Sequence, residues 1–148
     1  MNIDGDAPVQ VRAETTIDAP PEVVWDILAA VDRWSTWNPE VARAHLDGPL
    51  LPGASIRWKA GRASITSSVA TVVRPSELAW TGRTLGLHAV HVWRLDAHEG
   101  GTRIRSEESM RGLPALLARG RVTAMLERAL HAWFTALEAE AGRRRAGM

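Results

Sequence analysis

The C-terminal stretch from Pro114 to Arg145 constrains the fold more than any other part of the sequence. Its apolar residues recur with helical spacing and share one broad stripe, which consists of Val122, Leu126, Leu130, Trp133, Leu137 and Ala141, with Phe134 at its edge. Charged side chains occupy the opposite side. An α-helix of about thirty residues is about 45 Å long, more than a small domain needs unless another element wraps around it. We therefore expect a curved sheet to enclose this helix.

Arg119 interrupts the pattern, because it falls at the centre of the apolar stripe if the helix runs straight through Gly120. Either Gly120 bends the helix and shifts its phase, or Arg119 points towards the interior. The bend is the favoured interpretation, since Leu113 and Leu117 are also out of phase with the later stripe. An inward Arg119 would be suited to bind the carboxylate of a ligand.

The chain before this helix alternates apolar and polar side chains in the manner of β-strands, apart from one segment. Residues 9–17 predict a first strand, and Pro20-Pro21 opens a short helix. A second short helix holds Trp34 and Trp37 and ends at Asn38-Pro39. Six further strands are predicted over residues 41–46, 55–60, 63–73, 77–82, 87–97 and 102–110. This order predicts an α+β fold with one antiparallel meander.

Composition restricts the class of protein. The chain has 148 residues, of which 45% are apolar and 24% charged, with a formal net charge of +1, so we expect one globular domain over residues 1–148 with an ordered core at about 9–141. The arginines are scattered and balanced by acids, which argues against binding of nucleic acid. The absence of cysteine excludes thiolate sites. Without a long apolar run or a leader pattern, we expect a cytoplasmic protein with no stable membrane insertion.

Strand parity predicts which side chains face the interior. They are Ile56, Trp58, Leu78, Trp80, Leu87, His91, Trp93, Ile104, Ser106, Glu108 and Met110. Most of these suit a hydrophobic core, but a buried polar group costs about 1–3 kcal/mol unless it finds a partner. The polar pair His91 and Glu108 therefore stands out, because the turn Glu99-Gly100-Gly101 joins their strands and places His91 nearly opposite Ser109 or Glu108.

Two interpretations of this pair remain open. A carboxylate beside an imidazole raises the pKa of the histidine and orients its ring, so His91 and Glu108 are candidate catalytic residues for general acid/base chemistry. The alternative, which is favoured, is that the two groups satisfy each other inside a polar patch of core. A metal site is not predicted, because His88 and His91 lie three apart on a strand and point to opposite faces.

Seven tryptophans accompany a single phenylalanine, and tryptophan lines ligand pockets as readily as it fills cores. Trp25 and Trp133 lie on the apolar faces of helices and are expected in the core. The candidate ligand-binding residues are Trp34, Trp37, Trp58, Trp80, Trp93, Ser106, Met110 and Arg119. The tryptophans among them either line a cavity for a planar ligand or fill a dry interior, and both arrangements fit the sequence.

Several stretches resemble the START-like, or SRPBCC, helix-grip proteins. The opening carries Ile17-Asp18-Ala19-Pro20-Pro21-Glu22-Val23-Val24-Trp25, followed by Trp34-Ser35-Thr36-Trp37-Asn38-Pro39. The later stretches Leu51-Pro52-Gly53, Ile56-Arg57-Trp58-Lys59, Leu78-Ala79-Trp80, His91-Val92-Trp93-Arg94-Leu95 and residues 101–108 are similar to the polyketide cyclase/dehydrase-type branch. The resemblance covers about residues 9–141. It implies a seven-stranded antiparallel sheet curved around a long C-terminal helix, with a deep apolar cavity between them.

The resemblance also implies binding of an apolar or aromatic small molecule, without a cofactor. One version is a polyketide cyclase/dehydratase in which His91 and Glu108 transfer protons. The alternative is a carrier or sensor of lipids or other hydrophobic ligands that catalyses nothing. An interaction module that uses the outer face of the sheet ranks last, because Arg57, Lys59 and Arg94 make that face charged. Nothing in the sequence indicates the oligomeric state.

Overall fold

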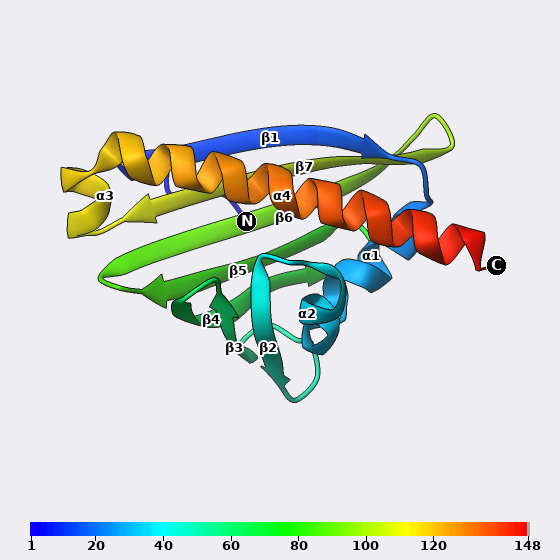
Figure 1. Cartoon of the computed structure of the whole chain (residues 1–148), viewed down its shortest axis with the longest axis horizontal. Coiled ribbons are helices and arrows are strands. Elements are labelled where there is room, and N and C mark those ends of the chain that lie inside the picture. The colour runs from blue at the N-terminus through cyan, green and yellow to red at the C-terminus, as the bar shows by residue number, and fades with distance from the viewer. Residues whose placement is uncertain (148) are drawn as a thin grey trace.

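A seven-stranded antiparallel sheet packs one face against a long C-terminal helix in the computed structural model, which describes residues 1–147 (Figure 1). The strands are β1 (Val9–Ile17), β2 (Val41–Asp47), β3 (Ser55–Ala60), β4 (Ala63–Val73), β5 (Glu77–Thr84), β6 (Leu87–His98) and β7 (Gly101–Arg111). The helical elements are α1 (Pro21–Ala29), the 3₁₀ turn η1 (Val31–Arg33), α2 (Trp34–Trp37), α3 (Leu113–Leu117) and α4 (Arg119–Ala146). The predicted α+β helix-grip architecture is confirmed.

The sheet is a meander with one non-sequential strand at its edge. Its order is β1-β7-β6-β5-β4-β3-β2, so β1 joins the last strand of the meander and not the next one along the chain. Figure 1 shows α4 crossing the concave side of the sheet over β1, β7 and β6, with α1 and α2 at the other end of these strands from α3. The interior thus lies between α4, the two short helices and the curved sheet.

The C-terminal helix is interrupted, which corrects the prediction of one helix from Pro114 to Arg145. Ala118 has φ −125° and ψ 43°, outside helical geometry, and separates α3 from α4. The break lies two residues before Gly120, where a bend was expected. It places Arg119 at the start of α4 with its side chain exposed, and so avoids the large cost of burying an unpaired charge. Within residues 1–147, none of the helices has both the length and the apolarity needed to span a bilayer.

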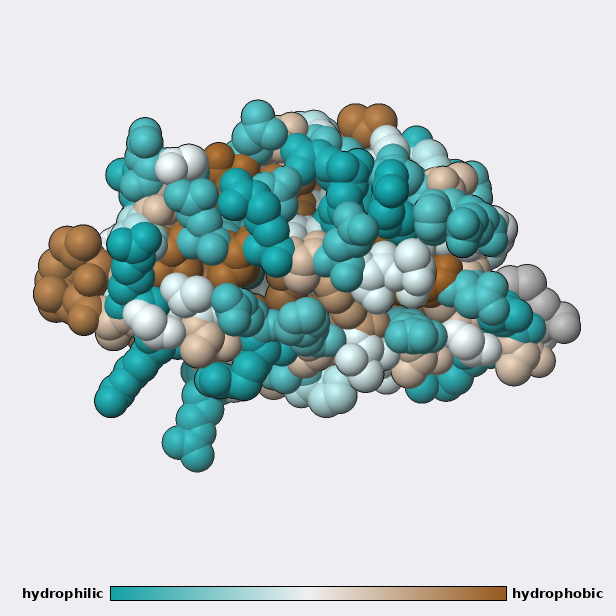
Figure 2. Space-filling model, turned by 90° about the horizontal axis from the view of Figure 1, so that it is seen from above, coloured by the Kyte–Doolittle hydropathy of each residue, from teal (hydrophilic) through white to brown (hydrophobic). Residues whose placement is uncertain are grey.

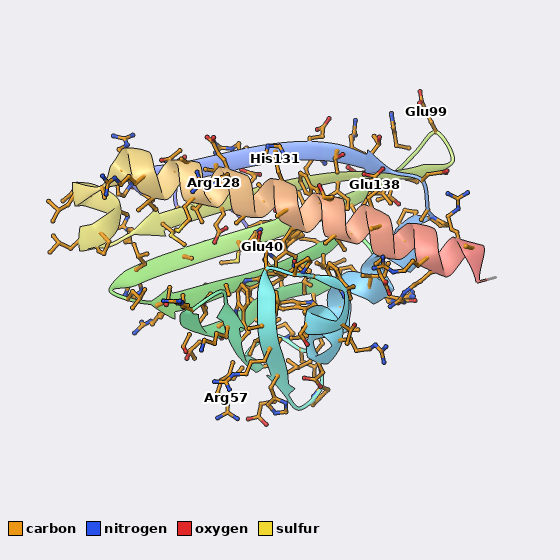
Figure 3. All side chains as sticks on the ribbon, viewed as in Figure 1. Glu40, Arg57, Glu99, Arg128, His131 and Glu138 are labelled. Atoms are coloured by element: carbon orange, nitrogen blue, oxygen red, sulfur yellow. The ribbon has the colours of Figure 1, made fainter. Side chains whose placement is uncertain are left out.

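The apolar stripe of α4 and the interior face of the sheet agree with their predictions. Val122, Leu126, Leu130, Trp133, Phe134, Leu137 and Ala141 are all buried. The cross-strand pairs Leu78–Trp93, Trp80–His91 and Trp93–Ser106 place these side chains on the same face of the sheet. Arg128, His131 and Glu138 lie along the exposed side of α4 (Figure 3).

Buried polar bonds close the end of the sheet that carries α1 and α2. The Trp34 indole N–H donates to the carbonyl oxygen of Leu28 at 2.9 Å and thereby holds α2 against α1. The Thr102 hydroxyl, fully buried at the start of β7, donates to the carbonyl oxygen of Ala19 at 2.7 Å. The first bond orients α2 and therefore the two tryptophans that it carries, and the second joins β7 to the turn before α1.

At the opposite end, the β5–β6 hairpin touches the turn between β7 and α3. Gly112 has φ 124°, and a Cβ atom there would overlap the carbonyl oxygen of Gly86. A Cβ atom at Gly86 would in turn lie 3.8 Å from Cδ of Pro114. Only glycine combines this φ with such a close approach of two backbones, so Gly112 allows the hairpin and α3 to pack together.

Candidate functional site

Six tryptophans meet between the sheet and α4. Trp34 lies at their centre, with ring centroids 5.4 Å from Trp58, 5.2 Å from Trp80 and 5.1 Å from Trp133. Trp37 and Trp93 complete the group through contacts with Trp133 at 5.9 and 5.6 Å. Edge-to-face and tilted contacts at these distances are favourable packing geometries for aromatic rings. Between the sheet and α4 the indole rings therefore fill the interior, which is the second of the two arrangements predicted from the sequence.

The indole N–H groups of this cluster differ in their partners. Trp58 donates to the Ser67 hydroxyl at 3.0 Å, as Trp34 does to a backbone carbonyl. The N–H groups of Trp37 and Trp93 are buried and have no hydrogen-bond partner among residues 1–147. A buried donor without a partner is uncommon in a native protein, so the Trp93 N–H is a position where a ligand oxygen would gain a bond.

His91 lies beside this cluster and is held by two kinds of contact. Its ring stacks on Trp93, with centroids 4.9 Å apart and an interplanar angle of 27°. Its Nε2 atom lies 2.9 Å from the Ser106 hydroxyl oxygen, and that hydroxyl donates to the carbonyl oxygen of Val92 at 3.3 Å. When the hydroxyl proton is donated to Val92, the Ser106 oxygen accepts from His91 and the imidazole proton lies on Nε2. Nδ1 is then left as an acceptor.

Glu108 is the residue that Nδ1 faces. His91 and Glu108 are direct cross-strand partners in the β6–β7 ladder, and Nδ1 lies 3.6 Å from Glu108 Oε1. This separation is longer than a hydrogen bond, so a shift of a few tenths of an ångström would complete one. The side chain of His91 is 7% exposed and that of Glu108 is 15% exposed, which makes Glu108 the member nearer to solvent.

Burial sets the protonation of both groups. Removal from water lowers the pKa of His91 to about 3 and raises the pKa of Glu108 to about 8, because the charged form of each group is the one that burial disfavours. The expectation that Glu108 raises the pKa of His91 is therefore wrong: desolvation outweighs the attraction, and Glu108 itself is uncharged at neutral pH. A neutral imidazole faces a protonated carboxyl group.

These opposite shifts predict the dependence of stability on pH. The pKa of Glu108 rises from 4.5 on folding, so its stabilising effect is complete below pH 4.5 and is lost as the pH rises to about 8. The pKa of His91 falls from 6.5, so its effect is complete above pH 6.5 and is lost as the pH falls to about 3. Between pH 6.5 and 8 we expect wild type to lose about 2 kcal/mol relative to Glu108→Gln. Urea unfolding across this range measures the difference, and parallel profiles of the two proteins would contradict the pKa assignment.

Two of the remaining candidate residues lie next to this pair and one lies away from it. Ser106 is fully buried and bonded to His91, and Met110 is buried two residues beyond Glu108 on β7. Arg119 is exposed at the first position of α4, so the structure does not place it as an anchor inside the sheet. The pair His91–Glu108, Ser106 and the tryptophans on the concave face form the candidate site.

Two hollows lie outside the tryptophan cluster. One, of about 420 Å³, lies between α2 and α4 and is lined by Trp37, Pro39, Glu40, Ala132, Thr135, Ala136, Ala139 and Arg143; Figure 3 shows Glu40 near the end of β2 that approaches α4. The other, of about 280 Å³, lies on the convex face and is lined by Asp4, Thr81, Gly82, Arg83, His88, Ala89, Val90, Ser109 and Arg111. The hollow between α2 and α4 could have been predicted from the small residues at helical spacing on α4. The hollow on the convex face could have been predicted from strand register.

The structure has the helix-grip fold, with an aromatic interior between the sheet and α4. The family model described as polyketide cyclase / dehydrase and lipid transport matches residues 8–142, and the chain belongs to this family. No curated protein sequence matches the chain closely enough to count as a relative.

Solved structures of low sequence identity share the fold. The hypothetical protein jhp0584 from Helicobacter pylori is 22% identical with a TM-score of 0.80, and the match covers 93% of this chain and 90% of the Helicobacter pylori protein. A START superfamily protein from Mycobacterium smegmatis is 13% identical with a TM-score of 0.76, covering 90% and 97%. The Zhui aromatase/cyclase from Streptomyces sp. R1128 is 20% identical with a TM-score of 0.76, covering 91% and 94%.

Proposed function

We propose that the protein binds an apolar, aromatic, polyketide-like molecule against the concave face of the sheet and promotes its cyclisation or dehydration by proton transfer. The observation that carries this proposal is the pair of uncharged groups, His91 and Glu108, side by side in an aromatic interior. A carboxyl group whose pKa of about 8 lies near neutrality is suited to donate a proton at neutral pH. Its neighbour presents an unprotonated nitrogen.

The pair can complete a dehydration without outside reagents. In a β-hydroxy ketone, His91 Nδ1 takes the proton from the carbon next to the carbonyl, and Glu108 gives its proton to the departing hydroxyl group. The carbon–oxygen bond breaks, a carbon–carbon double bond forms and one water leaves. The proton on His91 then returns to the Glu108 carboxylate across the 3.6 Å gap, which restores both groups.

Neighbouring residues support where the ligand would lie. Ala89 and Gly82 are cross-strand partners on the concave face, next to the pair formed by His91 and Trp80 on that face, and neither residue carries more than a methyl group beside the His–Glu pair. The greater exposure of Glu108 favours entry from its side. The unpartnered Trp93 N–H would bind a carbonyl oxygen of the ligand, and the tryptophan rings would stack on a planar molecule.

A carrier or sensor is the second candidate, and the packing of the six tryptophans favours it. The ring centroids of neighbouring tryptophans are already 5.1–6.5 Å apart. A ligand would therefore have to push these rings apart or bind at the edge of the cluster. The low pKa of His91, about 3, also makes it a weak base. The family description names lipid transport beside cyclisation.

Titration with a panel of ligands tests both candidates. The panel contains anthraquinone- and naphthalene-type aromatics, a long-chain fatty acid and an aromatic β-hydroxy ketone, with tryptophan fluorescence reporting binding and mass spectrometry reporting loss of water. We expect wild type to bind and dehydrate the β-hydroxy ketone, and Glu108→Gln to bind it similarly while turning over about 10²–10⁴-fold more slowly. Glu14→Gln, at an exposed position on β1, is the control and should behave as wild type.

Other outcomes separate the candidates. Binding without turnover in every protein would establish a carrier or sensor and assign the His–Glu pair to the core. A failure of the whole panel to quench fluorescence would contradict ligand binding on this face. Turnover by Glu108→Gln at the wild-type rate would contradict the role of the carboxyl group.

A further inference from the structure

Four leucines lie exposed at the end of the molecule that carries α3. Leu113, Leu116 and Leu117 are 65%, 65% and 77% exposed, and their i, i+3, i+4 spacing places them on one side of the short helix. Ala115, on the other side, is fully buried. Leu85, at the tip of the β5–β6 hairpin, is 78% exposed. We call these four residues the leucine tip.

The leucine tip is one surface, although its residues come from two segments. Leu85 is followed by Gly86, which packs against Gly112 and Pro114 at the start of α3. Figure 2 shows a hydrophobic group protruding at the end of the molecule where α3 lies in Figure 1. Exposed leucines gathered in this way mark a surface that contacts something apolar.

A row of basic side chains lies directly behind the leucine tip on the convex face. Arg83, His88 and Arg111 are consecutive cross-strand partners in the ladders of β5, β6 and β7. All three are exposed, and they line the hollow of about 280 Å³ together with Asp4, which pairs with Arg111. Arg83 makes no ion pair within residues 1–147. Arg83 therefore offers its guanidinium group to an anion such as a phosphate, which such a group binds with two parallel hydrogen bonds, while the guanidinium of Arg111 is held by Asp4 and adds positive charge beside it.

Further positive charge lies on the helical side of the tip. Arg119 and Arg121, in the first turn of α4, are both exposed. Leucines surrounded by arginines match the interface of an anionic bilayer, where apolar side chains enter the boundary of the acyl chains and basic groups contact phosphates. A second copy fits less well, because a two-fold contact through the same patch would bring the arginines of both copies together.

We propose that this end of the protein docks reversibly on the surface of a membrane that contains anionic phospholipids. The leucine tip enters the interface, and the row Arg83–His88–Arg111 receives a headgroup phosphate. The inference rests on surface residues and is independent of whether the interior pair His91–Glu108 is catalytic.

Co-sedimentation with lipid vesicles tests the docking. The full chain is mixed with vesicles of phosphatidylcholine alone, or with about a third of phosphatidylglycerol. We expect binding to the anionic vesicles only, weakened as salt is raised. The variant L113S/L116S/L117S should lose at least tenfold in binding. R83S/R111S should lose about fivefold for each arginine removed.

Matched variants control for altered solubility and charge. L51S/V73S changes two apolar residues that are 57% and 52% exposed and lie away from the leucine tip, and R57S/R62S removes two other exposed arginines. Both should bind anionic vesicles as wild type does. The proposal is overturned if wild type ignores anionic vesicles, if L113S/L116S/L117S binds them like L51S/V73S, or if wild type is a dimer that only the leucine substitutions dissociate.

Discussion

Replacing Trp34 by alanine is expected to lower the free energy of unfolding by about 3–5 kcal/mol, a large part of the total stability of an ordinary domain. Trp34 is completely buried, and its ring contacts those of Trp58, Trp80 and Trp133. Its removal therefore leaves a cavity in the middle of the tryptophan cluster. It also removes the donor to the carbonyl oxygen of Leu28, and a buried acceptor without a partner adds to the cost.

Urea unfolding followed by circular dichroism measures this effect. Circular dichroism is preferred to fluorescence because the substitution removes one tryptophan and so changes the fluorescence signal itself. Trp37→Ala is the matched control. Trp37 lies on the same short helix and is nearly as buried, but its indole N–H has no partner among residues 1–147 and its ring contacts one other tryptophan there, Trp133. We expect the control to lose distinctly less stability. An equal loss in both variants would contradict the central position of Trp34.

Gly112→Ala is expected to destabilise the protein by about 3 kcal/mol or more, through two effects that add. The φ angle of 124° is one that residues with a side chain rarely adopt. The new methyl group would also overlap the carbonyl oxygen of Gly86, and backbone cannot yield as a flexible side chain can. The hairpin and α3 would have to separate.

A second glycine isolates the effect of the contact. Gly48 has φ 82°, and nothing lies within 4 Å of a Cβ atom placed there. Gly48→Ala should therefore show the conformational cost alone, about 1–2 kcal/mol. Thermal unfolding of both variants is the measurement, and similar losses would show that the approach of Gly112 to Gly86 is not a tight one.

The strands could be predicted from the sequence because their signals are local. Alternation along most strands, together with glycine or proline at the turns, predicted the faces of the sheet, although the facing of residues 63–73 stayed ambiguous. The turn centred on Gly100 predicted the partner of His91 to within one residue. The break at Ala118 could not be predicted in position, because it depends on how α3 packs against the β5–β6 hairpin far away in the chain. Its signal was present in Leu113 and Leu117, which were out of phase with α4.

The protonation of His91 and Glu108 was harder to predict from the sequence. Pairing a histidine with a carboxylate suggested a raised histidine pKa, but the direction depends on how completely both groups leave water, which only the packed structure shows. Whether tryptophans line or fill a cavity likewise depends on distances between rings. The basic row on the convex face was not predicted, although strand register alone places Arg83, His88 and Arg111 side by side.

The position of β1 in the sheet has a consequence for how the chain acquires its structure. The strands from β2 to β7 pair with their neighbours in sequence, but Val9 pairs with Met110 and Ile17 with Thr102. Contacts between such distant residues form late, because the loop between them must first be closed. During synthesis β1 is made before its partner β7. Until β7 pairs with it, the backbone hydrogen-bonding groups of β1 are free to pair with other chains. A fragment that ends before β7 would retain that open edge and aggregate.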